Sequence, residues 1–131
     1  MIVVDASAMV AALVVEGDHA SALRDRLRGE RLQAPHLIDI EVLSALRRLI
    51  RASELAAGSA DRAVVRLRRW PLRRHPHSRL LSRVHQLRES VTSYDATYLA
   101  LAEAIEAPLV TCDGQLARAH RHGTTSEHHP I

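Results

Sequence analysis

Two aspartates stand directly after short apolar runs, where a carboxylate is placed to do chemistry. Asp5 follows residues 2–4 and Asp113 follows residues 109–112, and both runs predict buried, parallel strands. The carboxyl ends of such strands are where open α/β sheets bind their ligands. Each aspartate also has a structural alternative, because its side chain can accept hydrogen bonds from the free amides of a helix that follows it.

Two further acids lie on predicted helices, beside their apolar faces. Asp95 falls inside the apolar arc of its helix, and an isolated buried carboxylate is costly, so Asp95 should be hydrogen-bonded, paired or bound to a metal ion. Glu41 flanks the apolar face of a helix predicted over residues 36–52. Its structural alternative is that of a first-turn acid favoured by the helix dipole. The arc around Asp95 consists of Tyr94, Tyr98, Leu101, Ala102 and Ile105, and the predicted buried face beside Glu41 consists of Val42, Leu43, Leu46, Leu49 and Ile50.

Composition excludes several enzyme classes. The sequence contains no lysine, so it can have no phosphate-loop lysine and no Schiff-base lysine. Its arginines give a net charge of +3 with His neutral; arginine suits phosphate contacts, although solvated helix faces explain individual arginines equally well. Cys112 is the only cysteine, so no intrachain disulfide can form and a reducing compartment is expected. No apolar run is long enough to cross a bilayer and no signal peptide is visible, so we predict a cytoplasmic protein without membrane contact.

The acids need a scaffold, and the chain predicts one of alternating strands and helices. A length of 131 residues suits a single domain. Pro71 and Pro76 exclude a helix between them but leave room for a short strand. Strands separated by helices imply a parallel sheet covered on both faces. Strands are expected at residues 2–4, 32–34 and 109–112, and helices from Ser7, over 18–29, 36–52 and 59–70, around Leu80 to Leu87, and from Tyr94 to Ile105.

Five segments together carry a family resemblance. They are IVVDASA at the start, PHLIDIEVLSALRRL and WPLRRHP in the middle, and YDATYLALAEA with LVTCDGQLARA near the end. In this order and spacing the chain resembles the PIN-domain ribonucleases, specifically the VapC-type toxins of bacterial toxin–antitoxin pairs. The resemblance implies one PIN domain over residues 1–131, a three-layer α/β/α sandwich around a mainly parallel sheet. Gly114 departs from the bulkier residues usual after the fourth acid, and residues 124–131 match the family's last strand poorly, which suggests a loosely ordered tail.

The resemblance also implies a site. Asp5, Glu41, Asp95 and Asp113 match the family's catalytic acids, with Ser7 and Thr111 at its supporting hydroxyl positions. Asp5, Asp95 and Asp113 would bind Mg²⁺ or Mn²⁺, with Glu41 completing the site, so that activated water cleaves the RNA backbone. General chemistry points the same way, because converging carboxylates repel one another unless a cation neutralises them, and Mg²⁺ prefers oxygen ligands.

Partners follow from the same resemblance. A VapB-type antitoxin would cover the site. Exposed apolar helix surface would bind that antitoxin and would also form a toxin homodimer. The substrate would be a transfer, ribosomal or messenger RNA. Tyr94 and Tyr98 could stack on bases, although core packing fits Tyr98 better. Arginines that could contact RNA are Arg47, Arg48, Arg51, Arg73 and Arg74.

Three other functions would account for part of the sequence. A phosphatase of the haloacid-dehalogenase type also places an acid after its first strand, but it needs a second aspartate where Ser7 stands, and a lysine. A non-toxin PIN-like module for RNA processing or RNA binding remains the main alternative, although such modules usually lose some of the four acids. The pairs His120–His122 and His128–His129 could bind a transition metal, but they lack the spacing of a strong zinc site.

Overall fold

The computed structural model describes residues 1–119 and 125–131, and it is built around one parallel sheet. The strands lie in the order β3-β2-β1-β4-β5, and every neighbouring pair is parallel. The central strand β1 pairs through Ile2 with Leu32 of β2 and through Val3 with Leu109 of β4. The strands are β1 (Ile2–Val4), β2 (Leu32–Pro35), β3 (Leu72–His75), β4 (Leu109–Thr111) and β5 (Ser126–His128).

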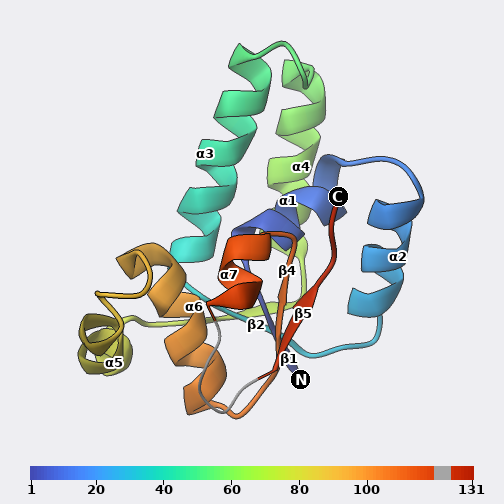
Figure 1. The fold of residues 1–131 in the computed structure, drawn as a ribbon. Coiled ribbons are helices and arrows are strands. Elements are labelled where there is room, and N and C mark those ends of the chain that lie inside the picture. Colours follow the sequence, from blue (N-terminus) through green and yellow to red (C-terminus); the bar gives the residue numbers. More distant parts are fainter. Residues whose placement is uncertain (120–124) are drawn as a thin grey trace.

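Helices cover the sheet and make the outer layers of an α/β/α sandwich (Figure 1). Helix α6 packs on β1, β2 and β4, whereas α1 packs against α2, α3 and α4. Helices α3 and α4 lie side by side as a hairpin that projects beyond the sheet (Figure 1). The helices are α1 (Ala6–Val14), α2 (Asp18–Leu27), α3 (Leu37–Arg51), α4 (Ala57–Arg69), the short η1 (Ser78–Leu80), α5 (Leu81–Gln86), α6 (Ser93–Ala104) and α7 (Gly114–Arg118).

The core consists largely of aliphatic side chains, as a sequence without Phe requires. All residues of β1 and β4 are buried, which explains why these strands are continuous apolar runs: a central parallel strand is covered on both faces. Tyr98 of α6 and Met9 of α1 are among the largest fully buried side chains. The predicted strands, helices and parallel sheet are therefore confirmed.

The predicted buried faces of two helices were partly wrong. Leu43 is 40% exposed and Ile50 is also exposed; the buried face of α3 is formed by Ile38, Val42 and Leu46. The reason is that the α3–α4 hairpin projects from the sheet, so only one narrow side of α3 is covered. Tyr94, expected in the apolar arc of α6, is 61% exposed because it lies in the first turn of that helix.

The chain's end forms a strand that the sequence did not predict. Ser126–His128 pairs in parallel with β4, and Glu127 accepts hydrogen bonds at 2.7 and 2.8 Å from Arg26 of α2. This two-point ion pair joins β5 to α2. The expected pair His120–His122 lies outside the described residues. Among residues 1–119 and 125–131, no helix combines the length and apolarity needed to cross a membrane.

Candidate active site

Asp5 ends β1 and begins α1, and its carboxylate is held on both oxygens. Oδ1 accepts from the Ala8 amide at 2.9 Å and from Ser7 Oγ at 2.8 Å, while Oδ2 accepts from Thr111 Oγ1 at 2.7 Å. Asp5 is only 4% exposed, and burial raises its pKa to about 6 despite these hydrogen bonds. Asp5 therefore caps α1, as its structural alternative predicted, and also lies at the edge of an open cleft.

Ser7 and Thr111 join β1 to β4 at this point. Ser7 Oγ lies 3.2 Å from Thr111 Oγ1 and accepts from the Cys112 amide at 2.9 Å. Thr111 Oγ1 in turn accepts from the Asp113 amide at 2.9 Å. The two hydroxyls thus fix both strand ends, and with them the positions of Asp5 and Asp113, relative to each other.

Asp113 and Asp95 lie at the N-terminal ends of helices α7 and α6. Asp113 is the N-cap of α7, and its Oδ1 accepts from the Gln115 amide at 2.8 Å. Asp95 lies in the first turn of α6, where its amide donates to the N-cap Thr92. Burial, together with the charges of Asp113 and Glu41, raises the pKa of Asp95. The Asp95 carboxylate makes no hydrogen bond within the described part of the chain, so it is free to meet a ligand.

Glu41 receives a hydrogen bond that the sequence analysis missed. The Tyr98 hydroxyl donates to Glu41 Oε1 at 2.5 Å, across from α6 to α3. Burial and the Glu41 charge raise the pKa of Tyr98 well above its usual value, so the hydroxyl keeps its proton and stays a donor. Its position three residues after Asp95, on the same helical face, was the available signal; the sequence analysis predicted core packing or base stacking for Tyr98 and no hydrogen bond.

The four acids meet in one cleft of about 380 Å³. Asp5, Glu41, Asp95 and Asp113 all line it, with Ser7, Tyr98 and Arg48 in its walls. An all-oxygen, multiply anionic set of this kind fits a hard divalent cation by its chemistry. Within residues 1–119 and 125–131, however, no three His, Cys, Asp or Glu side chains are grouped as a preformed metal site. Asp5, Glu41 and Asp113 each turn toward a hydrogen-bond donor instead, which keeps like charges apart.

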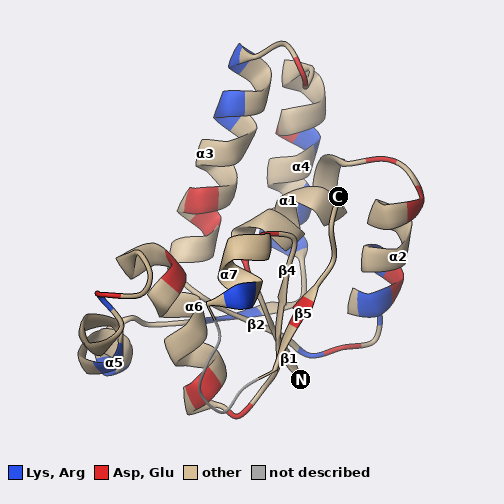
Figure 2. Ribbon diagram, viewed as in Figure 1, with Lys and Arg blue, Asp and Glu red and all other residues tan. Residues whose placement is uncertain are grey.

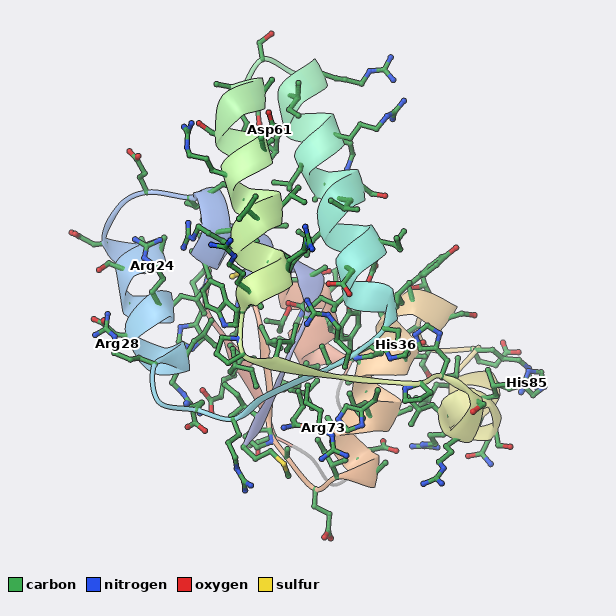
Figure 3. All side chains as sticks on the ribbon, turned by 180° about the vertical axis from the view of Figure 1, so that it is seen from behind. Arg24, Arg28, His36, Asp61, Arg73 and His85 are labelled. Atoms are coloured by element: carbon green, nitrogen blue, oxygen red, sulfur yellow. The ribbon has the colours of Figure 1, made fainter. Side chains whose placement is uncertain are left out.

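The five predicted RNA-contacting arginines are not equivalent. Arg48 lines the acidic cleft, whereas Arg47 and Arg51 of the same helix are exposed and do not line it. Arg73 lies below His36, on the side of the sheet away from the α3–α4 hairpin (Figure 3). Arg74 makes a two-point ion pair with Asp39, with distances of 2.7 and 2.9 Å, so its guanidinium is already engaged. The structure brings Arg48 alone of these five into the walls of the cleft.

The remaining candidates lie apart from this chemistry. Cys112 is half-buried, and burial and Asp5 raise its pKa to about 11, so the thiol is protonated and unreactive at neutral pH. The His129 amide donates to the Thr111 carbonyl, and the His129 ring lies 3.9 Å from Glu127. His128 and His129 therefore belong to the end of the sheet.

Known proteins share this architecture along nearly the whole chain. A family model for the PIN domain matches residues 2–121. VapC ribonuclease Mb0985 of Mycobacterium bovis is 44% identical over 117 residues, 89% of each chain. Ribonuclease VapC12 of Mycobacterium tuberculosis is 39% identical over 127 residues, which cover 97% of this chain and 98% of the relative. Ribonuclease VapC1 of the same organism is 46% identical over 118 residues, 89% of each chain.

Two solved structures show the same fold. A crystal structure of PAE2754 from Pyrobaculum aerophilum superposes with a TM-score of 0.72 at 26% identity, covering 95% of this chain and 82% of that one. The structure of VapC20 from Mycobacterium tuberculosis, described as a sarcin-ricin loop cleaving toxin, gives a TM-score of 0.69 at 15% identity, covering 95% and 99%.

The fold and the acidic cleft define a PIN domain, and the chain belongs to the PIN-domain family. Within that family, its relatives over 89% or more of its length are VapC ribonucleases. The resemblance predicted from the sequence is confirmed at both levels.

Proposed function

We propose that this protein is the toxin of a VapBC-type pair, an endoribonuclease that hydrolyses RNA phosphodiester bonds with the help of Mg²⁺ or Mn²⁺. One observation carries the proposal: carboxylates from residues 5, 41, 95 and 113 line a single cleft in a chain that is 39–46% identical to VapC ribonucleases. The acids come from four separate elements, and packing alone gives no reason to collect like charges at one place.

Asp5, Asp95 and Asp113 are the residues that would bind the cation, and Glu41 would complete the site. When bound, a divalent cation supplies a Lewis acid that lowers the pKa of water and neutralises phosphate charge. The donor set fits this role, since the Asp95 carboxylate accepts no hydrogen bond from residues 1–119 and 125–131 and the other acids are held at the cleft wall. A cation in the cleft would also favour the charged form of Asp95, whose pKa is raised by burial and by the charges of Asp113 and Glu41.

The chain's own residues orient these acids and hold the substrate. Ser7 and Thr111 fix Asp5 through short hydrogen bonds, and Tyr98 holds Glu41. Arg48, in the cleft wall, presents a planar fork of donors suited to a phosphate. Arg47, Arg51 and Arg73 would extend this contact along the RNA, which could be a transfer, ribosomal or messenger RNA.

The exposed apolar side chains suit protein partners. Ile40, Leu43, Ile50 and Val65 are exposed on the α3–α4 hairpin, and Leu81 and Tyr94 are exposed near the start of α5 and α6. Such surface suits contact with a VapB-type antitoxin or a second copy of the toxin. We expect the antitoxin to obstruct the acidic cleft, the dimer to form in solution, and the pair to act in the cytoplasm.

The test is cleavage by the purified protein. Total RNA is incubated with Mg²⁺, Mn²⁺ or EDTA, using the wild type, Asp5→Asn, Asp95→Asn and the matched control Asp61→Asn, which replaces an exposed acid on α4. We expect cleavage by the wild type and Asp61→Asn only, and only with a metal ion. Cleavage that persists in EDTA or in both site variants would contradict the proposal. RNA binding without any cleavage would favour the alternative of a non-catalytic PIN-like RNA-binding module.

A further inference from the structure

A second cleft adjoins the acidic one. It has a volume of about 530 Å³ and lies between the segment that joins α5 to α6 and helix α7. It is lined by residues 88–92, Asp95, Gln115 and Ala119. Asp95 lines both clefts, so the two adjoin at this residue. An extended ligand that lies over Asp95 can therefore occupy both.

The lining of this second cleft offers hydrogen-bond donors. The Arg88 guanidinium is exposed; its Nη1 donates to the His85 carbonyl, and its Nε lies 3.8 Å from Glu89, which is itself almost fully exposed. An exposed pair at that distance contributes little, so most of the five guanidinium donors make no hydrogen bond to the residues that the structure describes. Thr92 Oγ1 accepts from the Asp95 amide, which leaves its own hydrogen to donate, and the Gln115 side chain is exposed.

The same lining lacks the features of a base-recognition pocket. Among the described residues its apolar members are Val91 and Ala119, and none of its side chains is aromatic. Stacking on an aromatic ring is the usual means of holding an unpaired base. Arginine, hydroxyl and amide donors instead suit phosphate and sugar oxygens, contacts that position a strand without reading its sequence.

Charge explains why a nuclease needs such a place. Four carboxylates in the central cleft repel a phosphate chain, so the chain needs cationic contacts on either side of them. Figure 2 shows positively charged segments at the end of α3 farther from α6, and a negatively charged segment of α3 near the start of α6. Arg48 of α3 supplies one cation in the central cleft. Arg88, beyond Asp95, supplies a second on the other side, where the largely exposed Glu89 also lines the second cleft.

We propose that the second cleft is a subsite for the RNA backbone, in which Arg88, Thr92 and Gln115 bind the nucleotides that continue on one side of the scissile phosphate. The inference rests on the proposed ribonuclease function and extends it, because it assigns a path for the strand outside the acidic centre. The subsite binds sugar and phosphate oxygens of single-stranded RNA.

Another cavity, between α1, α2 and α4, supplies a contrast and a control. It has a volume of about 850 Å³. Its Arg24 and Arg66 donate to the Val15 and Leu13 carbonyls at the end of α1, and it does not include any of the four acids. Arg62, in the wall of this cavity, donates to Ser59 three residues earlier, much as Arg88 donates to His85. Arg62→Ala is thus a matched arginine deletion outside the proposed path.

The test compares RNA length, because a subsite outside the centre matters only to a strand long enough to reach it. Affinities of a fluorescein-labelled mixed-sequence tetranucleotide and dodecanucleotide are measured for the wild type, Arg88→Ala, Gln115→Ala and Arg62→Ala over a series of salt concentrations. We expect Arg88→Ala to raise the Kd for the dodecanucleotide about tenfold and to lower the salt slope by about one. The affinity of Arg88→Ala for the tetranucleotide should equal that of the wild type. Arg62→Ala should bind both oligonucleotides as the wild type does. Gln115→Ala should act in the same direction with a smaller effect and no change in salt slope.

Crosslinking locates the strand directly. A dodecanucleotide carrying 4-thiouridine at successive positions is photo-crosslinked to the wild type, and the modified peptides are identified by mass spectrometry. Crosslinks within residues 88–92 or at Gln115 support the subsite. If the wild type cleaves RNA but the Arg88 and Gln115 variants bind it normally, or all crosslinks lie elsewhere, the subsite is wrong and the ribonuclease function stands. If the wild type neither binds nor cleaves RNA, both proposals fail.

Discussion

At the scale of single residues, the acids of the cleft combine a structural and a proposed chemical task. Asp5 and Asp113 are the N-caps of α1 and α7, so the hydrogen bonds that aim them are those that start the helices. This explains why the sequence could not decide between a cap and a ligand: in the structure the capping geometry holds each carboxylate at the wall of the cleft. The cost of this placement is visible at Asp5, whose burial raises its pKa to about 6.

Asp5→Asn should therefore make folding less sensitive to pH. Between the unfolded pKa of 3.8 and the folded pKa of about 6, the folded protein binds the extra proton, so the unfolding free energy of the wild type falls as pH rises through this window. We expect the variant to be more stable than the wild type at pH 8 without divalent ions, by about 3 kcal/mol at most, less the lost Thr111 hydrogen bond. The advantage should vanish below pH 4.

Urea denaturation at pH 4, 6 and 8 measures this effect, with Asp61→Asn as a control whose stability should follow the wild type. A variant whose stability declines with pH as steeply as that of the wild type would show that folding does not raise the pKa of Asp5.

Tyr98→Phe should separate the two roles of the Tyr98 side chain. Phe keeps the buried ring and removes only the hydroxyl that holds Glu41. The free energy of unfolding should therefore fall by about 1 kcal/mol. RNA cleavage should fall about tenfold in kcat with little change in KM, because Glu41 loses its orientation while the substrate contacts remain. Tyr94→Phe, on the exposed side of the same helix, is the matched control and should change neither. Wild-type kcat in Tyr98→Phe would mean that the hydroxyl serves packing alone.

At the scale of elements, the sequence predicted best the strands that are buried on both faces. Residues 2–4 and 109–111, all apolar except Thr111, form β1 and β4, and each of them is buried. The pattern misled where burial is one-sided: Leu43 and Ile50 have the spacing of a core face, yet the projecting hairpin leaves them exposed. Periodicity shows that a helical face is apolar, but it does not show whether that face meets the core or another protein.

The last strand, β5, was not predicted for a different reason. Ser126–His128 contains no apolar residue and so gave no strand signal, because its formation depends on pairing with β4 and on the ion pair between Glu127 and Arg26. The ion pair between Arg74 and Asp39 could not be predicted for the same reason, because the two residues lie far apart in the sequence. Long-range partners of single charged residues leave no trace in a local pattern.

Arg73 and Arg74 should consequently differ when replaced. Arg74 joins β3 to α3 through Asp39 and to the Leu67 carbonyl at the end of α4, whereas Arg73 is exposed. We expect Arg74→Ala to lower the unfolding free energy by about 1–2 kcal/mol and Arg73→Ala to leave it unchanged. RNA affinity at matched folded fractions should fall for Arg73→Ala if that residue contacts the strand. Equal stability of the two variants would refute the structural role assigned to Arg74.

At the scale of the whole molecule, the fold gathers acids that are remote in the chain. The parallel sheet brings the ends of β1 and β4 side by side, and α3 and α6 reach the same place through the contact of Glu41 with Tyr98. The result is an anionic centre in a protein of net charge +3. Since no cluster of three metal ligands is preformed in the described chain, a cation would have to be bound at the expense of the hydrogen bonds and protons that now keep the carboxylates apart.

This competition predicts a metal effect on stability that depends on pH. Mg²⁺ or Mn²⁺ binding to the folded protein stabilises it by RT ln(1 + [L]/Kd), and protons compete for the same carboxylates. With the pKa of Asp5 near 6 and that of Asp95 also raised, the Tm increase caused by Mn²⁺ should be large at pH 8 and small at pH 5. Differential scanning fluorimetry without RNA measures it, and NaCl at equal ionic strength should not reproduce it. Asp5→Asn and Asp95→Asn should each abolish most of the increase, and Asp61→Asn none of it. An increase that is equal at both pH values, or that survives in both site variants, would place the cation elsewhere and remove the physical basis for a metal centre in this cleft.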